Sequence, residues 1–470
     1  MTKVGLFGIG LDTYWPQFDG LLDKLTGYQE QIKNKITGFG VEVADAGMVD
    51  NPVKAREAAD FLKSQDVEIV FLYVSTYALS STVLPVAQKL KVPVVVLNLQ
   101  PVAQLDYNAF NKLGGRGKMT GTWLENCQAC SVPEIASVFN RSGIQYDFVT
   151  GYLQDEEAWN DIKGWTEAAG VVASMRNNRL GVLGHYYNGM LDVYSDLTMQ
   201  SAVFGTHIEL LEMCELKKYR DEASEEAIKK KIEEFNTAFD VSEECEAKEI
   251  KRAAQTSVAL DKLVATRGLG SMAYYYEGES GNEYENIVTS VIAGNTLLTG
   301  KNIPIAGECE VKNAQAMKIM DAFGAGGSFS EFYLMDFKDD AVYLGHDGPG
   351  HYAIAEGRVN LVPLSVYHGK PGKGLSIQMT VKHGPVTLLS VVEGKDGIFL
   401  LVAEGESVEG PVLQIGNTNS RYKFSIGAKR FMNEWSKQGP SHHCAIGVGH
   451  IADKIEKLGQ ILNIDVVKIC

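Results

Sequence analysis

Residues 67–74 read Val-Glu-Ile-Val-Phe-Leu-Tyr-Val, and residues 92–97 read Val-Pro-Val-Val-Val-Leu. Short apolar runs that are rich in β-branched residues are typical of strands buried on both faces. Similar runs lie at 4–9 and 41–44, and amphipathic segments typical of helices lie between the runs, at 18–36, 53–62 and 78–90. Strands that alternate with helices indicate βαβ units and a parallel sheet covered on both faces.

A second region of the same kind follows, and after residue 330 the pattern changes. Strands are expected at 179–183 and 206–211, with helices at 156–169, 223–239 and 249–265. Later runs alternate with Gly, Asp and Lys turns at hairpin spacing, which indicates an antiparallel sheet or small barrel, at 376–381, 386–392 and 398–403. A helix at 451–458 and a strand at 465–468 end the chain.

We therefore predict an α/β protein with two Rossmann-like parallel α/β domains and a C-terminal antiparallel β-barrel-like domain. The expected boundaries are 1–175, 176–325 and 326–470, the last domain carrying the terminal helix. A chain of 470 residues exceeds the size of a single core, which agrees with two or three domains.

The composition excludes several classes of protein. The net charge of −15 argues against binding to nucleic acid or to an anionic membrane, because both need a cationic face. No apolar run reaches the roughly 18 residues that span a bilayer, and the first residues lack the features of a signal peptide. Seven cysteines, an odd number, suggest reduced thiols. We predict a cytoplasmic protein whose partner is a small neutral molecule.

Glycines after the first predicted strand raise the possibility of a dinucleotide site. The stretch Gly5-x-x-Gly8-x-Gly10 does not match the G-x-G-x-x-G fingerprint, because Thr13 occupies the place of the third glycine. The glycine-rich stretch 114–118 lacks the surroundings of a phosphate-binding loop, and we expect a surface loop or a lid there. The charged run 215–234 is expected to form a solvated helix face.

The residues best suited to chemistry gather late in the chain. Glu308 follows Ala-Gly, Glu331 lies in Ser-Phe-Ser-Glu-Phe-Tyr, His346 follows Tyr-Leu-Gly, and His442 and His443 stand in tandem. Seven of the nine histidines come after residue 345. Carboxylates beside glycines, joined by imidazoles, suit a hard divalent cation that must also hold a polyhydroxylated ligand.

Each of these residues also has an ordinary structural explanation. Glu308 could cap the helix expected at 314–323, and Glu331 could face solvent from a strand. A histidine at the end of a strand, such as His346, is as often structural as a ligand, and His351 competes with it for the same role. Neighbouring residues in a strand point to opposite sides, so only one of the pair 442–443 should reach a common metal.

These motifs resemble the bacterial L-arabinose isomerase family in their order and spacing. The similarity rests on Gly307-Glu308-Cys-Glu, Gly326-Gly327-Ser-Phe-Ser-Glu331-Phe-Tyr, Tyr343-Leu-Gly-His346 and His442-His443. The resemblance implies three domains and a homo-oligomer, a trimer or a hexamer of trimeric rings, with active sites at subunit interfaces. It also implies one Mn²⁺, two glutamates that move the substrate proton, and the metal ligands Glu308, Glu331, His346 and His443.

The chain differs from that family in the segments that contact the sugar in the family. Residues 10–15 read Gly-Leu-Asp-Thr-Tyr-Trp in place of a Ser-Gln-His-Leu-Tyr-Gly segment, Leu113 replaces a histidine, and residues 273–278 carry three tyrosines. Aromatic rings stack on the C–H faces of sugars and carboxylates accept their hydroxyl hydrogens. We expect the substrate to be bound by Asp12, Tyr14, Trp15 and Tyr275. The alternative is that Tyr14 and Trp15 only pack against the edge of the sheet.

The sequence predicts an intramolecular oxidoreductase, a metal-dependent aldose–ketose isomerase that acts through an enediolate. Two oxygen and two nitrogen ligands suit Mn²⁺, with Mg²⁺ or Co²⁺ as substitutes. One alternative is an isomerase of the same family with a different or modified sugar as substrate. Others are a metal-dependent hydrolase or lyase that uses the same four residues, and a cytosolic sugar-binding protein without enzymatic activity on the same scaffold.

Overall fold

The computed structural model describes residues 2–277, 281–365 and 372–470. The chain divides into two compact units. The first comprises Met1–Ala173 with Gln460–Asn463, and the second comprises Ser174–Gly459 with Ile464–Cys470. The division falls inside helix α7 (Glu156–Arg176).

The first unit is built on a five-stranded parallel sheet of order β2-β1-β3-β4-β5. Its strands are β1 (Lys3–Ile9), β2 (Glu42–Val49), β3 (Val70–Val74), β4 (Val94–Gln100) and β5 (Tyr146–Tyr152). All five residues of β3 are buried, because helices cover both faces and leave no position for a polar side chain. The strand order reverses at β1, so the loops after β1 and β3 flank the place where doubly wound sheets bind ligands.

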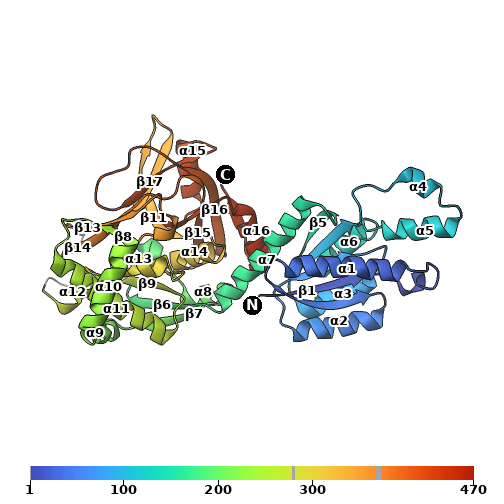
Figure 1. Cartoon of the computed structure of the whole chain (residues 1–470), viewed down its shortest axis with the longest axis horizontal. Helices are drawn as coiled ribbons and strands as arrows, with labels where there is room; N and C mark the ends of the chain where they lie inside the picture. Colours follow the sequence, from blue (N-terminus) through green and yellow to red (C-terminus); the bar gives the residue numbers. More distant parts are fainter. Residues whose placement is uncertain (1, 278–280, 366–371) are drawn as a thin grey trace. The chain divides into compact units, whose positions relative to one another are not determined.

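The helices of this unit form two layers (Figure 1). Side chains of α1 (Leu21–Thr37) and α7 pack on one face of the sheet. The other face is covered by α2 (Pro52–Ser64), α3 (Ser80–Leu90) and α6 (Val132–Ser142). Two short helices, α4 (Tyr107–Asn111) and α5 (Arg116–Glu125), belong to the connection between β4 and β5, and η1 (Asp12–Tyr14) follows β1.

The second unit begins with a four-stranded parallel sheet of order β10-β9-β6-β7. Its strands are β6 (Arg179–Gly184), β7 (His207–Leu211), β9 (Ser271–Tyr275) and β10 (Ile305–Ala306). The accompanying helices are η2 (Leu191–Val193), α8 (Leu197–Phe204), α9 (Met213–Asp221), α10 (Glu225–Ala238), α11 (Ala247–Arg267), α12 (Glu283–Val288), α13 (Ile292–Thr299) and α14 (Val311–Ala322). Glu308 lies in the short connection that leaves β10, at the carboxyl edge of this sheet.

A seven-stranded, mainly antiparallel sheet completes the second unit, in the order β15-β18-β11-β12-β17-β16-β19. Its strands are β11 (Ser328–Asp336), β12 (Ala341–His346), β15 (Gly384–Gly394), β16 (Gly397–Val408), β17 (Thr418–Phe424), β18 (His443–Val448) and β19 (Val466–Lys468). β15 pairs with both β18 and β16, and only the pairing of β16 with β19 is parallel. A separate three-stranded sheet of order β14-β13-β8 is formed by β8 (Phe239–Val241), β13 (Val359–Leu364) and β14 (Gly374–Gln378). The remaining elements are η3 (Tyr352–Ile354), α15 (Ala428–Lys437) and α16 (Ala452–Leu462).

The coarse part of the predicted fold class is confirmed: the chain is an α/β protein with two parallel sheets and a mainly antiparallel sheet after residue 326. The barrel and the three domain boundaries stay predictions. Within the described ranges, no helix is both long enough and apolar enough to cross a membrane.

Two local predictions are correct only in part. Most charged side chains of the run 215–234 are exposed or partly exposed, as predicted. The run is divided between α9 and α10, however, and Lys231 is buried in ion pairs with Glu234 and Asp261. The stretch 114–118 is not only a loop, because α5 begins at Arg116.

Candidate active site

Three adjacent strands and one tight connection bring the predicted metal ligands together. Glu331 on β11 is paired in register with His443, the first residue of β18, and on its other side with Gly345 of β12. His346 is the last residue of β12. Glu308 comes from the connection between β10 and α14, so residues distant in sequence meet at one place.

The ligand atoms form two overlapping groups. One oxygen of Glu308 and one ring nitrogen each of His346 and His443 lie within 4.8 Å of one another, and Glu331, His442 and His443 meet the same limit. His443 belongs to both groups. All four predicted ligands are therefore close together, and His442 joins them.

The pair formed by Glu308 and His443 fits a cation. Glu308 Oε2 lies 3.6 Å from His443 Nε2, both atoms are buried, and neither has a hydrogen-bond partner among the described residues. A buried polar atom without a partner costs about 1–3 kcal/mol. A carboxylate oxygen and an imidazole nitrogen are both ligands that Mn²⁺ accepts, so the donor chemistry matches the metal that the sequence predicts.

Glu308 occupies an unusual backbone conformation. Its φ is +55° and that of Cys309 is +59°, in the left-handed region that non-glycine residues seldom adopt. Hydrogen bonds hold this turn, since Cys309 N donates to the carbonyl of Tyr274 and Glu310 N to the carbonyl of Gly307, each at 3.0 Å. Such strain often accompanies functional sites.

Glu310 orients His443, a role that the sequence did not reveal. Its carboxylate Oε2 lies 2.5 Å from His443 Nδ1, and both side chains are buried. Glu310 precedes the first residue of α14 but does not cap it with its side chain. Holding the Nδ1–H of His443 in this way leaves Nε2 as the nitrogen that faces Glu308. The spacing Glu-x-Glu before a helix was the one signal in the sequence.

His442 lies on the same side as His443. Its Nε2 is 3.6 Å from Glu308 Oε2 and 4.0 Å from Glu331 Oε2, while its Nδ1 is 2.6 Å from Asp192 Oδ2. The two rings do not point opposite ways, because His442 precedes β18 and the alternation of a strand does not apply to it. Burial opposes a charge on His442, but the neighbouring carboxylates of Glu308 and Asp192 outweigh it and raise its pKa to about 9.

His351, the competitor to His346, is directed elsewhere. Its ring is buried, and its Nε2 lies 3.9 Å from Asp321 Oδ1. It belongs to neither of the two groups of ligand atoms found in the described chain.

A cavity of about 320 Å³ opens onto the ligand groups. Glu308, Glu331, His346 and His442 form part of its wall. Tyr275 and Tyr187 form another part, with ring centroids 4.6 Å apart. Burial raises the pKa of Tyr275, so its ring is uncharged. Tyr275, predicted to bind substrate, thus shares a cavity with the predicted metal ligands.

Asp12, Tyr14 and Trp15 lie in the first unit, directly after β1. Trp15 Nε1 donates to Asp50 Oδ2 at 2.8 Å, and the rings of Tyr14 and Trp15 pack against Leu21 and its neighbours. Their predicted contact with substrate stays a prediction, as does the alternative that both aromatic rings only pack.

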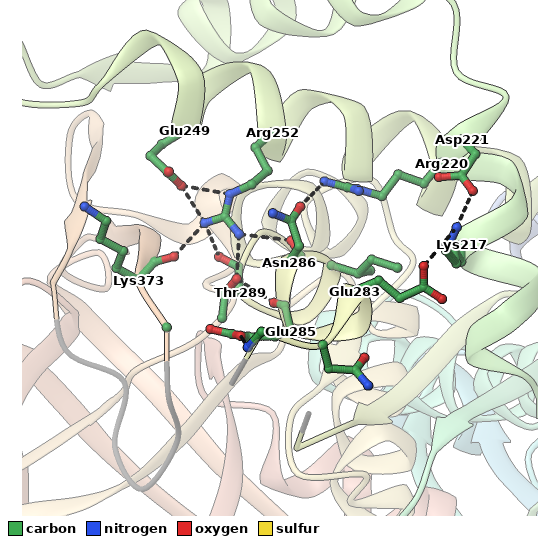
Figure 2. Close-up of a pocket in the computed structure, with 14 residues that line it drawn as sticks. Lys217, Arg220, Asp221, Glu249, Arg252, Glu283, Glu285, Asn286, Thr289 and Lys373 are labelled. Atoms are coloured by element: carbon green, nitrogen blue, oxygen red, sulfur yellow. Dashed lines mark hydrogen bonds and ion pairs between the residues drawn. The ribbon is translucent and has the colours of Figure 1, made fainter. Parts of the chain in front are cut away.

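A second cavity of the same unit, about 590 Å³, has a different character (Figure 2). Figure 2 shows the Arg252 guanidinium between Glu249 and Thr289, to both of which it donates, and Arg220 donating to Asn286. Every charged side chain that lines this cavity is paired within the described chain: Lys217, Arg220, Asp221, Glu249, Arg252, Glu283, Glu285 and Lys373. These pairs join α9, α11 and α12, so the charges there have a structural role.

The known proteins that the chain resembles are all named as isomerases of sugars. The chain is 22% identical over 330 residues to a sulfoquinovose isomerase of Alkalicoccus urumqiensis, which covers 69% of this chain and 72% of that protein. It is 21% identical over 360 residues to an L-arabinose isomerase of Bacillus subtilis (72% and 69%). An L-arabinose isomerase of a Nocardioides species is 22% identical over 349 residues (70% and 68%). No family model matches the chain.

Proposed function

Because the chain is a divergent relative of the L-arabinose isomerases, we propose that it interconverts an aldose and its 2-ketose with a divalent cation held by Glu308, Glu331, His346 and His443. The relatives are named isomerases, and the predicted class of enzyme is thereby confirmed. The observation that carries the cation site is the buried pair Glu308 Oε2 and His443 Nε2, without hydrogen-bond partners in the described part of the chain.

Each of the four residues would supply one ligand atom to the cation. Two carboxylates and two imidazoles suit Mn²⁺, with Mg²⁺ or Co²⁺ as substitutes. When bound, such a cation polarises two neighbouring substrate oxygens and makes the proton on C2 more acidic. Glu310 keeps the His443 ring in the orientation that presents Nε2.

The reaction needs no co-reactant, because the aldose and ketose are isomers. A glutamate takes the proton from C2 and returns it to C1, while a proton moves from the C2 hydroxyl to the C1 oxygen. Glu308 and Glu331 both border the cavity, so one can carry the carbon-bound proton and the other the hydroxyl proton.

The substrate is a sugar, which we place against Tyr275 and Tyr187. The cavity volume lies at the low end of the range for small-molecule sites. We propose that L-arabinose is a poor substrate, because Leu113 and the tyrosines of 274–276 replace the polar residues of the resembling family. Asp12, Tyr14 and Trp15 are proposed to complete the sugar site in a homo-oligomer of three or six copies in the cytoplasm.

The test is an assay of the purified protein with Mn²⁺ and a panel of pentoses, hexoses, deoxyhexoses and a sulfonated hexose. Ketose formation should be detected for at least one aldose with the wild-type protein and not with Glu308→Gln. If no aldose gives ketose while sugars still bind, the chain is a sugar-binding protein and the proposed reaction is wrong.

A further inference from the structure

Asp192 connects three segments of the second unit beside the cavity. Its carboxylate accepts a hydrogen bond from the backbone N–H of His442 at 3.0 Å and lies 2.6 Å from the ring Nδ1 of the same residue. Its backbone carbonyl accepts from Ser441 Oγ at 3.1 Å and from Lys312 Nζ. One residue of η2 thus fixes the segment that precedes β18 and contacts the start of α14.

This connection determines which way the His442 ring faces. With Nδ1 held by Asp192, the opposite nitrogen Nε2 is directed at Glu308 and Glu331, at 3.6 and 4.0 Å. His442 lines the cavity, and its side chain is 37% exposed, so a ligand in the cavity can touch it. The neighbouring His443 ring has no exposed surface and is held by Glu310 instead.

We propose that Asp192 is a positioning residue for the isomerisation: it holds His442 so that Nε2 hydrogen-bonds a substrate hydroxyl beside Glu308 and Glu331. This inference rests on the proposed function, and it adds a substrate-contacting imidazole that is distinct from the metal ligands. Asp192 does not line the cavity of about 320 Å³ that Glu308, Glu331, His346 and His442 border. It borders another cavity, of about 400 Å³, together with Glu331 and His442, and its hydrogen bonds go to His442, so its effect on the reaction is expected to pass through that residue.

The substitution Asp192→Asn tests the pair with little change of shape. The hydrogen bonds to the Asp192 carbonyl involve the backbone and are retained. The amide oxygen can still accept a hydrogen bond, but loss of the negative charge weakens the contact that holds the His442 ring. We expect kcat to fall about 10- to 100-fold, the range typical of a weakened partner that orients an imidazole. KM and the Mn²⁺ content should stay near wild type. Asp196→Asn is the matched control, because Asp196 caps α8 through its side chain and should leave kcat unchanged.

A double-mutant cycle separates positioning from a general structural effect. If Asp192 acts through His442, adding Asp192→Asn to His442→Gln lowers kcat no further, within a factor of about 2. Effects that multiply in the double variant would overturn the proposal. A wild-type kcat in Asp192→Asn, or a loss of bound Mn²⁺ in that variant, would overturn it as well.

A readout independent of turnover is the NMR resonance of the His442 Nδ1–H. In protein labelled with ¹⁵N-histidine, this proton should exchange slowly with water, disappear in His442→Gln and exchange rapidly in Asp192→Asn. An unchanged resonance in Asp192→Asn would contradict the pairing. If wild-type protein forms no ketose from any aldose, the proposed function fails, whereas this resonance still decides whether Asp192 holds His442.

Discussion

Two cavities of the second unit differ in whether the charged side chains beside them have bonding partners. In the larger one, about 590 Å³, every charged side chain of the described lining has an ion-pair or hydrogen-bond partner, as Arg252 has in Glu249 (Figure 2). The smaller one, about 320 Å³, brings acidic side chains together with imidazoles. At Glu308 of its wall and at the neighbouring His443, the buried atoms Glu308 Oε2 and His443 Nε2 have no hydrogen-bond partner in the described residues.

This difference shows that neither the volume of a cavity nor the number of charged residues that line it identifies a binding site. Pairs such as Arg252 with Glu249 satisfy each other and require no ligand. Buried ligand atoms that carry an unmet bonding capacity cost stability until something binds them. The backbone strain at Glu308 and Cys309 occurs beside the smaller cavity, where the proposed cation site would give a functional reason to maintain it.

The largest effect is expected from Glu308→Gln in the smaller cavity. The amide preserves size but neither accepts a proton nor binds a cation with a full charge, so kcat should fall by at least ~10³-fold. Steady-state assays with Mn²⁺ measure this, and circular dichroism checks that the fold is retained. Wild-type turnover would remove Glu308 from the reaction and leave the comparison of cavities without support.

A smaller effect is expected from Glu310→Gln, because Glu310 is not itself a predicted metal ligand but holds the ring of the ligand His443. Without the carboxylate at 2.5 Å, the His443 ring loses its fixed orientation. Affinity for Mn²⁺ should fall about 10- to 100-fold, as titration calorimetry would show. An unchanged dissociation constant would mean that Glu310 only fills space beneath the site.

The next prediction concerns the sugar. With tyrosines and Leu113 where the resembling family has polar residues, kcat/KM for L-arabinose should be about 10-fold or more below that of the best aldose in the panel. Specificity constants measured side by side decide the matter. If L-arabinose is the best substrate, the altered residues do not set specificity.

The smallest effect on activity is expected in the larger cavity. Arg252→Met removes hydrogen bonds to Glu249, Thr289 and the Lys373 carbonyl, and should lower the free energy of unfolding by about 2–4 kcal/mol. kcat and KM should stay at wild-type values. Urea unfolding and the isomerase assay on the same preparation test both statements. A loss of turnover with unchanged stability would assign a functional role to this cavity.

The strands and the site differ in how far the sequence predicts them. Runs such as 67–74 predict β3 well, because a strand covered on both faces is apolar throughout. The helices α4 to α6 were not predicted, and α5 carries glycines at 117 and 121 that weaken a helical pattern.

Within the site, the four metal ligands could be predicted from the sequence because each lies in a local motif of its own. Asp192 has no such motif for its role, and Glu310 has only the spacing Glu308-x-Glu310. Their contacts with His442 and His443 join residues separated by 250 and 133 positions in sequence. Only the folded chain brings these pairs together, and the orientation of His442 also depends on its place before β18.

The most direct test of the central claim is the dependence of ketose formation on metal. The protein is stripped with a chelator, dialysed and titrated with Mn²⁺, while bound metal and ketose are measured together. The account predicts no turnover in the stripped protein, recovery that saturates at one Mn²⁺ per chain, and neither binding nor recovery in Glu308→Gln/His443→Gln. Full turnover in the stripped protein, or unchanged Mn²⁺ binding in that double variant, would contradict it.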